Sequence, residues 1–312
     1  MSRPRRLSAW PIPLVAAAFL TACAPDGADI VANAAYKETI EAWRSEREAT
    51  LTEPYGWLSL IGLHPLARGE TRVGSSHDAD LRLPRGPSLW GVIVFDGETA
   101  VFEAADDWDD DPANGALGWR SGETARPVET AGIRFELLER ADGPHVRVRD
   151  QEGPNRTNFV GLEWYAVDRS WAVDAAFETN PPGTTMRVAD VTGEIAERPN
   201  PGAVVFSRNG KEYRLQAVQS ATAGRLWFIF ADGTSGRETY GLGRFLYAEA
   251  PRDGRVLVDF NQAYNPPCAF SEHTTCPLPP PANRLDLRIE AGELAYTGAV
   301  GLRPASVRDP LP

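Results

Sequence analysis

The chain has 312 residues, a formal net charge of −11, 28 glycines and 26 prolines. Such an acidic chain is a poor partner for nucleic acid, so we expect no nucleic-acid ligand. The glycine and proline content is high for a helical protein and typical of short strands joined by tight turns.

The first predicted element is a bacterial lipoprotein signal peptide, residues 1–22. Arginines at positions 3, 5 and 6 precede an apolar run that ends in Leu20-Thr21-Ala22-Cys23. Small residues before a cysteine are typical of lipoprotein cleavage sites, whereas a membrane-spanning helix needs about 20 apolar residues. A signal peptide of a soluble protein, cut near Ala22, is the alternative.

If the signal is removed, the mature chain begins at Cys23, which we expect to carry lipid. More than one acyl chain on this residue gives stable membrane anchoring. Ala24 rather than Asp follows the cysteine. By resemblance to enterobacterial lipoproteins, this predicts an outer-membrane location facing the periplasm. Residues 23–34 are interpreted as a tether.

One helix is predicted over residues 33–51. Tyr36, Ile40, Trp43 and Arg47 recur at helical spacing, and Glu53-Pro54 ends the pattern. Short strands separated by turns fill the rest of the chain, with a boundary near residue 150. The predicted fold class is mainly β. An antiparallel sandwich-like unit together with the helix covers residues 35–150, and a barrel or sandwich unit covers residues 151–312. The expected strands of the second unit include residues 159–163.

Part of the first unit resembles the core of a forkhead-associated β-sandwich. The resemblance rests on Val73-Gly74-Ser75-Ser76, Asp80-Leu81-Arg82-Leu83-Pro84 and Gly91-Val92-Ile93-Val94. Phosphothreonine readers of that family carry an arginine where this chain has Ser75, and the later histidine is missing. The sequence therefore argues against phosphopeptide binding.

Two cysteines, Cys268 and Cys276, remain in the mature chain besides Cys23. An even pair in an oxidising compartment predicts one disulfide. The alternative is a metal site, because His273 lies between them, but three ligands are unusual for structural zinc. No metal site and no cofactor are predicted.

The segment from Phe230 to Glu293 carries the most specific pattern. It contains Asp232-Gly233-Thr234-Ser235-Gly236, Gly243-Arg244-Phe245-Leu246, Asp259-Phe260-Asn261-Gln262-Ala263-Tyr264-Asn265-Pro266-Pro267-Cys268 and Asn283-Arg284-Leu285. These motifs resemble bacterial domain-of-unknown-function family 1684. The resemblance implies a shared fold and no particular activity.

The same segment is rich in polar and aromatic side chains beside the predicted disulfide. Rigid loops on β scaffolds often bind ligands, and we expect Arg244 to contact an anion or carbonyl group and Tyr264 to form a wall. The candidate ligand-binding residues are Glu238, Tyr240, Arg244, Asp259, Asn261, Tyr264 and Asn265. A purely structural role for these residues is the alternative.

Three functions follow as hypotheses. The first is an envelope lipoprotein that binds a small polar ligand or a glycan through the C-terminal unit. The second is an enzyme, either a hydrolase that uses Asp259 or Glu238, or a flavin-type split barrel. The third is a structural or assembly partner. The familiar sequence motifs of catalysis are missing, so the sequence does not decide whether there is catalysis.

Overall fold

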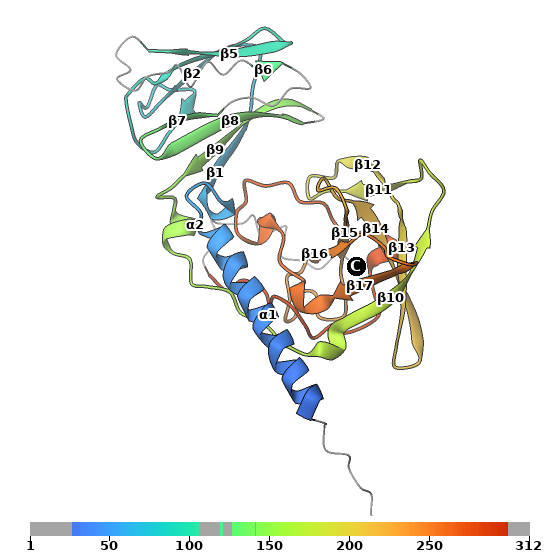
Figure 1. Cartoon of the computed structure of the whole chain (residues 1–312). Coiled ribbons are helices and arrows are strands. Elements are labelled where there is room, and N and C mark those ends of the chain that lie inside the picture. The colour runs from blue at the N-terminus through green and yellow to red at the C-terminus, as the bar shows by residue number, and fades with distance from the viewer. Residues whose placement is uncertain (1–26, 106–118, 121–126, 141, 299–312) are drawn as a thin grey trace, which may run out of the picture.

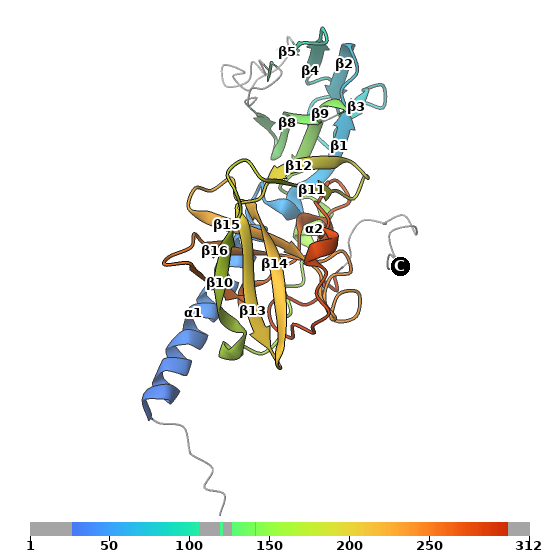
Figure 2. The same ribbon diagram turned by 90° about the vertical axis from the view of Figure 1, so that its right-hand side faces the viewer.

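The computed structural model describes residues 27–105, 119–120, 127–140 and 142–298. They form two β-rich units and a long helix, α1 (Gly27–Leu51), that lies along the second unit (Figures 1 and 2). The predicted fold class is confirmed, since strands hold 43% of the described residues, far more than the helices. The predicted signal peptide and Cys23 lie outside the described residues. Within the described ranges, no helix has the length and apolar composition needed to cross a membrane.

Helix α1 begins earlier than expected and ends where expected. It starts at Gly27, so residues 27–34 are helical although they were predicted to belong to the tether. It ends at Leu51, three residues before Pro54, which cannot continue the backbone hydrogen-bond pattern. Ile40 and Leu51 are buried, which defines the face of the helix that packs on the protein.

The N-terminal unit is a sandwich of two sheets. Its strands are β1 (Leu60–Pro65), β2 (Gly69–Gly74), β3 (Leu81–Arg82), β4 (Gly91–Phe95), β5 (Thr99–Ala104), β6 (Trp119–Arg120), β7 (Val128–Thr130), β8 (Ile133–Arg140) and β9 (Gly143–Asp150). One sheet has the order β1-β9-β8-β7 and the other β3-β2-β4-β5-β6. Alternate residues of β8, such as Ile133 and Phe135, share a core with Trp90 and Ile93 of the facing sheet.

The C-terminal unit is built on one strongly curved sheet. Its strands are β10 (Ala172–Thr179), β11 (Thr185–Ala189), β12 (Ile195–Pro199), β13 (Gly202–Arg208), β14 (Lys211–Gln219), β15 (Arg225–Phe230), β16 (Arg244–Glu249) and β17 (Arg255–Asp259). The order β16-β15-β14-β13-β10-β17 makes a nearly closed barrel, with β11 and β12 as a separate hairpin. Phe228, Phe230, Leu246 and Phe260 fill the barrel interior.

Short helical turns connect these strands. They are η1 (Trp57–Ser59), α2 (Pro154–Thr157), η3 (Arg169–Trp171), η4 (Phe260–Gln262), η5 (Pro267–Ala269) and η6 (Pro281–Asn283). Two of them, η3 and η4, contact α1. These contacts place the helix against one end of the barrel.

A second apolar cluster lies on the outer face of the barrel. Ile229 of β15 and Phe245 of β16 point outward, opposite in direction to the interior residues of the same strands. Leu51 and Leu58 pack into this outer cluster and not into the sandwich core. Helix α1 therefore belongs with the C-terminal unit, which corrects its expected grouping with residues 35–150.

The strand expected over residues 159–163 is absent. The chain there is irregular, and its nearest ladder contact is a single bridge between Trp164 and Glu293. Conversely, β12 was not predicted, because Glu197 and Arg198 interrupt its apolar pattern. It forms because β11 supplies a partner along its full length.

Candidate functional site

Arg244, the first residue of β16, is fully buried. Its Nη2 atom lies 3.3 Å from Oδ2 of Asp232, and the guanidinium also donates to the backbone carbonyls of Ile289 and Ala291. The Asp232 carboxylate accepts further bonds from the Thr234 hydroxyl and the Ile289 amide, each at 2.7 Å. Arg244 therefore ties residues 289–291 to the barrel and presents no surface to a ligand.

Asp259 and Asn261 form a second group, at the end of β17. The Tyr36 hydroxyl of α1 donates to the Asp259 carboxylate at 2.8 Å, and Nδ2 of Asn261 donates to the same hydroxyl at 2.9 Å. Asn261 also bonds both the amide and the carbonyl of Asp168. Burial, followed by the bond to Asp259, raises the pKa of Tyr36. This group fastens the helix to the barrel.

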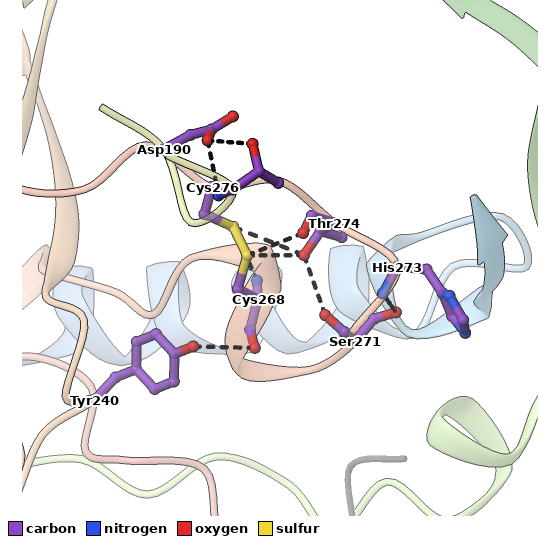
Figure 3. Close-up of a disulfide and its surroundings, with 8 residues drawn as sticks. Asp190, Tyr240, Cys268, Ser271, His273, Thr274 and Cys276 are labelled. Carbon is purple, nitrogen blue, oxygen red and sulfur yellow. Dashed lines mark hydrogen bonds between the residues drawn. A yellow bond between two sulfur atoms is a disulfide. The ribbon is translucent and has the colours of Figure 1, made fainter. Parts of the chain in front are cut away.

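Glu238 and Tyr240 were expected on one face of a strand, but they lie in an irregular turn. The Glu238 carboxylate is exposed and accepts a bond of 2.7 Å from Arg288. Tyr240 is buried, and its hydroxyl donates to the backbone carbonyl of Cys268 at 3.1 Å (Figure 3). The two side chains therefore have separate surroundings.

The predicted disulfide between Cys268 and Cys276 is present, with the two Cα atoms 6.1 Å apart. Both cysteines are buried, and Figure 3 shows the bridge beside Thr274 and Tyr240. The Thr274 hydroxyl donates to the carbonyl of Ser271 at 3.1 Å. The bridge and this bond stabilise the loop that follows η5.

Tyr264 and Asn265 belong to a third group, which surrounds Arg47 of α1. The Arg47 Cζ atom lies 4.8 Å from the ring centroid of Trp57 and 4.7 Å from that of Tyr264. Its Nε atom is 3.5 Å from Oε2 of Glu293, and its Nη2 atom donates to the Asn265 carbonyl at 3.1 Å. We call the residues around Arg47 the arginine cage: Trp57, Tyr264, Asn265, Phe270 and Glu293.

Glu293 supplies the carboxyl group of the cage. Its side chain is wholly buried, and this burial raises its pKa to about 7, although the positive charge of Arg47 opposes the shift. Its Oε1 atom has no hydrogen-bond partner among the described residues, and neither has Oδ1 of Asn265. Buried acceptors without donors are rare in proteins, so the cage has unused capacity for hydrogen bonding.

A row of aromatic rings continues from the cage along the outer face of the barrel. The Tyr264 and Tyr247 rings are nearly parallel, with centroids 6.3 Å apart, and Tyr247 and Trp227 follow with centroids 6.1 Å apart. Trp57 lies beside Tyr264 at 6.4 Å. The aromatic strip is Trp57, Tyr264, Tyr247 and Trp227. Trp57, Tyr247 and Trp227 are half-buried, so the strip is partly open to solvent.

Two arginines lie over rings of the strip. Arg47 stacks on Tyr264, and Arg225 lies over the Tyr247 ring at 4.8 Å. The pairing of Trp227 with Tyr247 across β15 and β16 fixes two of the rings side by side. The strip therefore combines flat apolar surface with two guanidinium groups.

A pocket of about 200 Å³ lies elsewhere, between the two units. It is lined by Glu139, Arg140, Val188, Asp190, Glu194, Ala196, Arg198, Thr275 and Pro277. It shares no residue with the arginine cage or the aromatic strip. Its charged groups have both signs, which gives it no clear preference for a ligand charge.

The seven candidate residues thus divide among separate surroundings. Only Tyr264 and Asn265 lie together in the arginine cage, and Arg244, Asp259 and Asn261 hold the scaffold. Sequence reasoning missed Arg47, Glu293, Tyr247, Trp227 and Trp57. Of these five residues, only Glu293 could have been suspected from the sequence. It is an acidic residue at the end of the family pattern, and its neighbours in Ala-Gly-Glu-Leu-Ala are apolar or small.

No curated protein gives a significant match to the chain. Among solved structures, an uncharacterized protein of Haloarcula marismortui, determined by NMR in solution, is 30% identical. That match covers 45% of this chain and 78% of the other, with a TM-score of 0.38. A family model described as "Protein of unknown function (DUF1684)" matches residues 157–294, which include every predicted signature motif after Phe230. Residues 157–294 of this chain therefore belong to the DUF1684 family.

Proposed function

We propose that this protein is a lipid-anchored protein of the bacterial cell envelope that binds a glycan on the aromatic strip. The anchor is the lipid on Cys23, and the expected location is the outer membrane facing the periplasm. The observation that carries the ligand proposal is the row of near-parallel rings of Tyr264, Tyr247 and Trp227, of which Tyr247 and Trp227 are half-buried and Tyr264 is buried.

The chemistry of the strip suits a sugar chain. The apolar faces of pyranose rings pack against aromatic side chains, and the hydroxyl groups need polar partners at the edges of the platform. The strip offers successive rings about 6 Å apart, with Arg225 beside Tyr247 as a donor. Four rings in a row support a ligand longer than one sugar.

Isothermal titration of the purified mature chain with chito-oligosaccharides and malto-oligosaccharides tests the proposal. Trp227→Ala and Tyr247→Ala should each weaken binding about two- to tenfold, since an aromatic stacking contact is worth roughly 0.5–1.5 kcal/mol. Tyr213→Ala is the matched control. Tyr213 is a half-buried tyrosine of the same sheet that stacks on Phe206, away from the strip.

Two other results would favour other functions. Binding that is equally weak in the wild type and in all three variants would remove the strip as a glycan site and favour a structural or assembly role. Flavin absorbance in the purified protein, or hydrolysis of a titrated oligosaccharide, would favour the enzyme alternative. In that case the catalytic carboxyl group has to be sought elsewhere than Asp259, which is bonded to Tyr36.

A further inference from the structure

The arginine cage has the composition of a site for an organic cation. Aromatic faces attract cations through their quadrupole, and a buried carboxylate supplies the opposite charge. Trp57, Tyr264 and Phe270 provide the rings, and their centroids lie 4.8, 4.7 and 5.8 Å from the Arg47 Cζ atom. Glu293 provides the carboxylate.

Arg47 uses only part of what the cage offers. A guanidinium has five N–H donors, but Arg47 makes one bond of 3.1 Å to the Asn265 carbonyl and one contact of 3.5 Å to Glu293. Two buried acceptors, Oε1 of Glu293 and Oδ1 of Asn265, have no hydrogen-bond partner among the described residues. The cage residues therefore hold two buried acceptors that Arg47 does not bond.

The cage and its occupant come from different parts of the chain. Four of the five cage residues lie within the stretch that matches the family model, whereas Arg47 on α1 and the fifth cage residue, Trp57 on η1, lie outside it. The Arg47 side chain therefore enters the cage from helix α1. The helix is held to the barrel at a second point, by the hydrogen bond between Tyr36 and Asp259.

We propose that the cage is a binding site for a small organic cation with a guanidinium or alkylammonium group, and that Arg47 occupies it as an internal substitute. A ligand that enters the cage displaces Arg47 and loosens the C-terminal half of α1. The inference goes beyond glycan binding. The cage and the strip share Trp57 and Tyr264, but Trp227 and Tyr247 lie outside the cage, so variants of those two residues test glycan binding separately.

Removing the occupant tests the proposal. Arg47→Ala should lower the Tm of the mature chain, and millimolar ethylguanidinium or tetramethylammonium should raise it again. At ten times the Kd the recovery should be about 2–5 °C, and the wild type should not gain stability from the same cation. If only ethylguanidinium restores the Tm, the ligand carries a guanidinium group; if only tetramethylammonium does, the ligand carries an alkylammonium group.

The matched control is Arg44→Ala. Arg44 lies one turn earlier on α1 and stacks on Trp164 at 4.9 Å, but no buried carboxylate faces it. The Tm of the Arg44→Ala variant should fall, and neither cation should restore it. The double variant Arg47→Ala/Glu293→Gln should bind the cations at least tenfold more weakly than Arg47→Ala. Equal responses of the Arg47→Ala and Arg44→Ala variants to both cations would overturn the proposal.

A second measurement applies if Arg47→Ala does not fold by itself. The variant is then refolded with and without ethylguanidinium, and the recovered folded protein is measured by circular dichroism. Recovery that depends on the cation, and that is lost in the double variant, supports the site. The opposite result is that Arg47→Ala fails to refold with and without ethylguanidinium while Arg47→Met folds normally. That result would show that the cage needs only an apolar side chain, and it would overturn the proposal.

Discussion

The Nε atom of Arg47 lies 3.5 Å from the Oε2 atom of Glu293, although 246 positions separate the two residues. Both side chains are almost wholly buried, at 9% and 0% exposure. The contact joins the N-terminal helix to the last part of the family signature. Removing one partner of such a pair leaves an uncompensated buried charge, so both residues constrain the fold.

The first prediction concerns pH. The pKa of Glu293 is raised by burial from 4.5 to about 7 in the folded chain. Because the folded state holds the proton more tightly, the stability contributed by this group is fully present below about pH 4.5. It is lost as the pH rises through about 7. The free energy of unfolding should therefore fall between pH 5 and 8 by up to the order of 3 kcal/mol from this group.

Urea unfolding of wild type and Glu293→Gln at several pH values measures this effect. The difference in free energy of unfolding between the two proteins should change with pH, because the amide does not titrate. A difference that stays constant from pH 5 to 8 would mean that the carboxyl group has an ordinary pKa.

The second prediction concerns Arg244. Arg244→Ala should destabilise the chain by about 3–5 kcal/mol, because the Asp232 carboxylate would be left buried without its partner. Urea unfolding followed by circular dichroism measures it. Arg255→Ala is the control, since its pair with Asp174 is exposed and should contribute about 0–1 kcal/mol. If Arg244→Ala lowers the free energy of unfolding as little as Arg255→Ala does, Arg244 does not hold the scaffold and a role in ligand binding has to be considered again.

The third prediction concerns Asn261. Asn261→Ala should cost about 1–3 kcal/mol, because it removes two hydrogen bonds to the backbone of Asp168, an exposed residue whose freed amide and carbonyl can bond water. Tyr36→Phe removes a single hydroxyl and should cost about 1 kcal/mol. The double variant should cost less than the sum, since Asn261 and Tyr36 share a hydrogen bond. A cost below about 1 kcal/mol for Asn261→Ala would indicate a role in ligand binding instead of in the scaffold.

The fourth prediction concerns the disulfide. Replacing Cys268 and Cys276 together by alanine should lower the free energy of unfolding by about 2–3 kcal/mol, the value for a short closed loop. Thiol titration of the denatured, unreduced wild-type chain should detect neither cysteine. Two titratable thiols from these positions in freshly prepared periplasmic material would contradict the prediction.

The fifth prediction concerns the anchor. Cys23→Ser should leave the protein unprocessed or soluble, because the lipid is attached to this side chain. Membrane fractionation and the mass of the mature chain measure it, with Cys268→Ser as a control that keeps Cys23. Mature-sized Cys23→Ser protein in the membrane fraction would place the anchor elsewhere.

The sequence by itself determined the class of fold, the helix and the disulfide. Apolar alternation identified β8, because a strand with one buried face carries its pattern locally. A continuous apolar run identified β15, whose side chains pack into clusters on both faces of the sheet. The spacing of Tyr36, Ile40 and Trp43 identified α1 for the same reason. The pattern failed at β12, whose pairing with β11 offsets its lack of apolar residues. The signature motifs identified the family.

Only the tertiary structure decided which polar residues act together. Arg244, Asp259 and Asn265 lie within 22 positions of one another in the sequence, yet they bond to Asp232, Tyr36 and Leu294 respectively. Burial and long-range pairing depend on how helix α1 and the final loop pack on the barrel. A local sequence pattern does not contain this information. For this reason the cage around Arg47 and Glu293 could not be seen in the sequence.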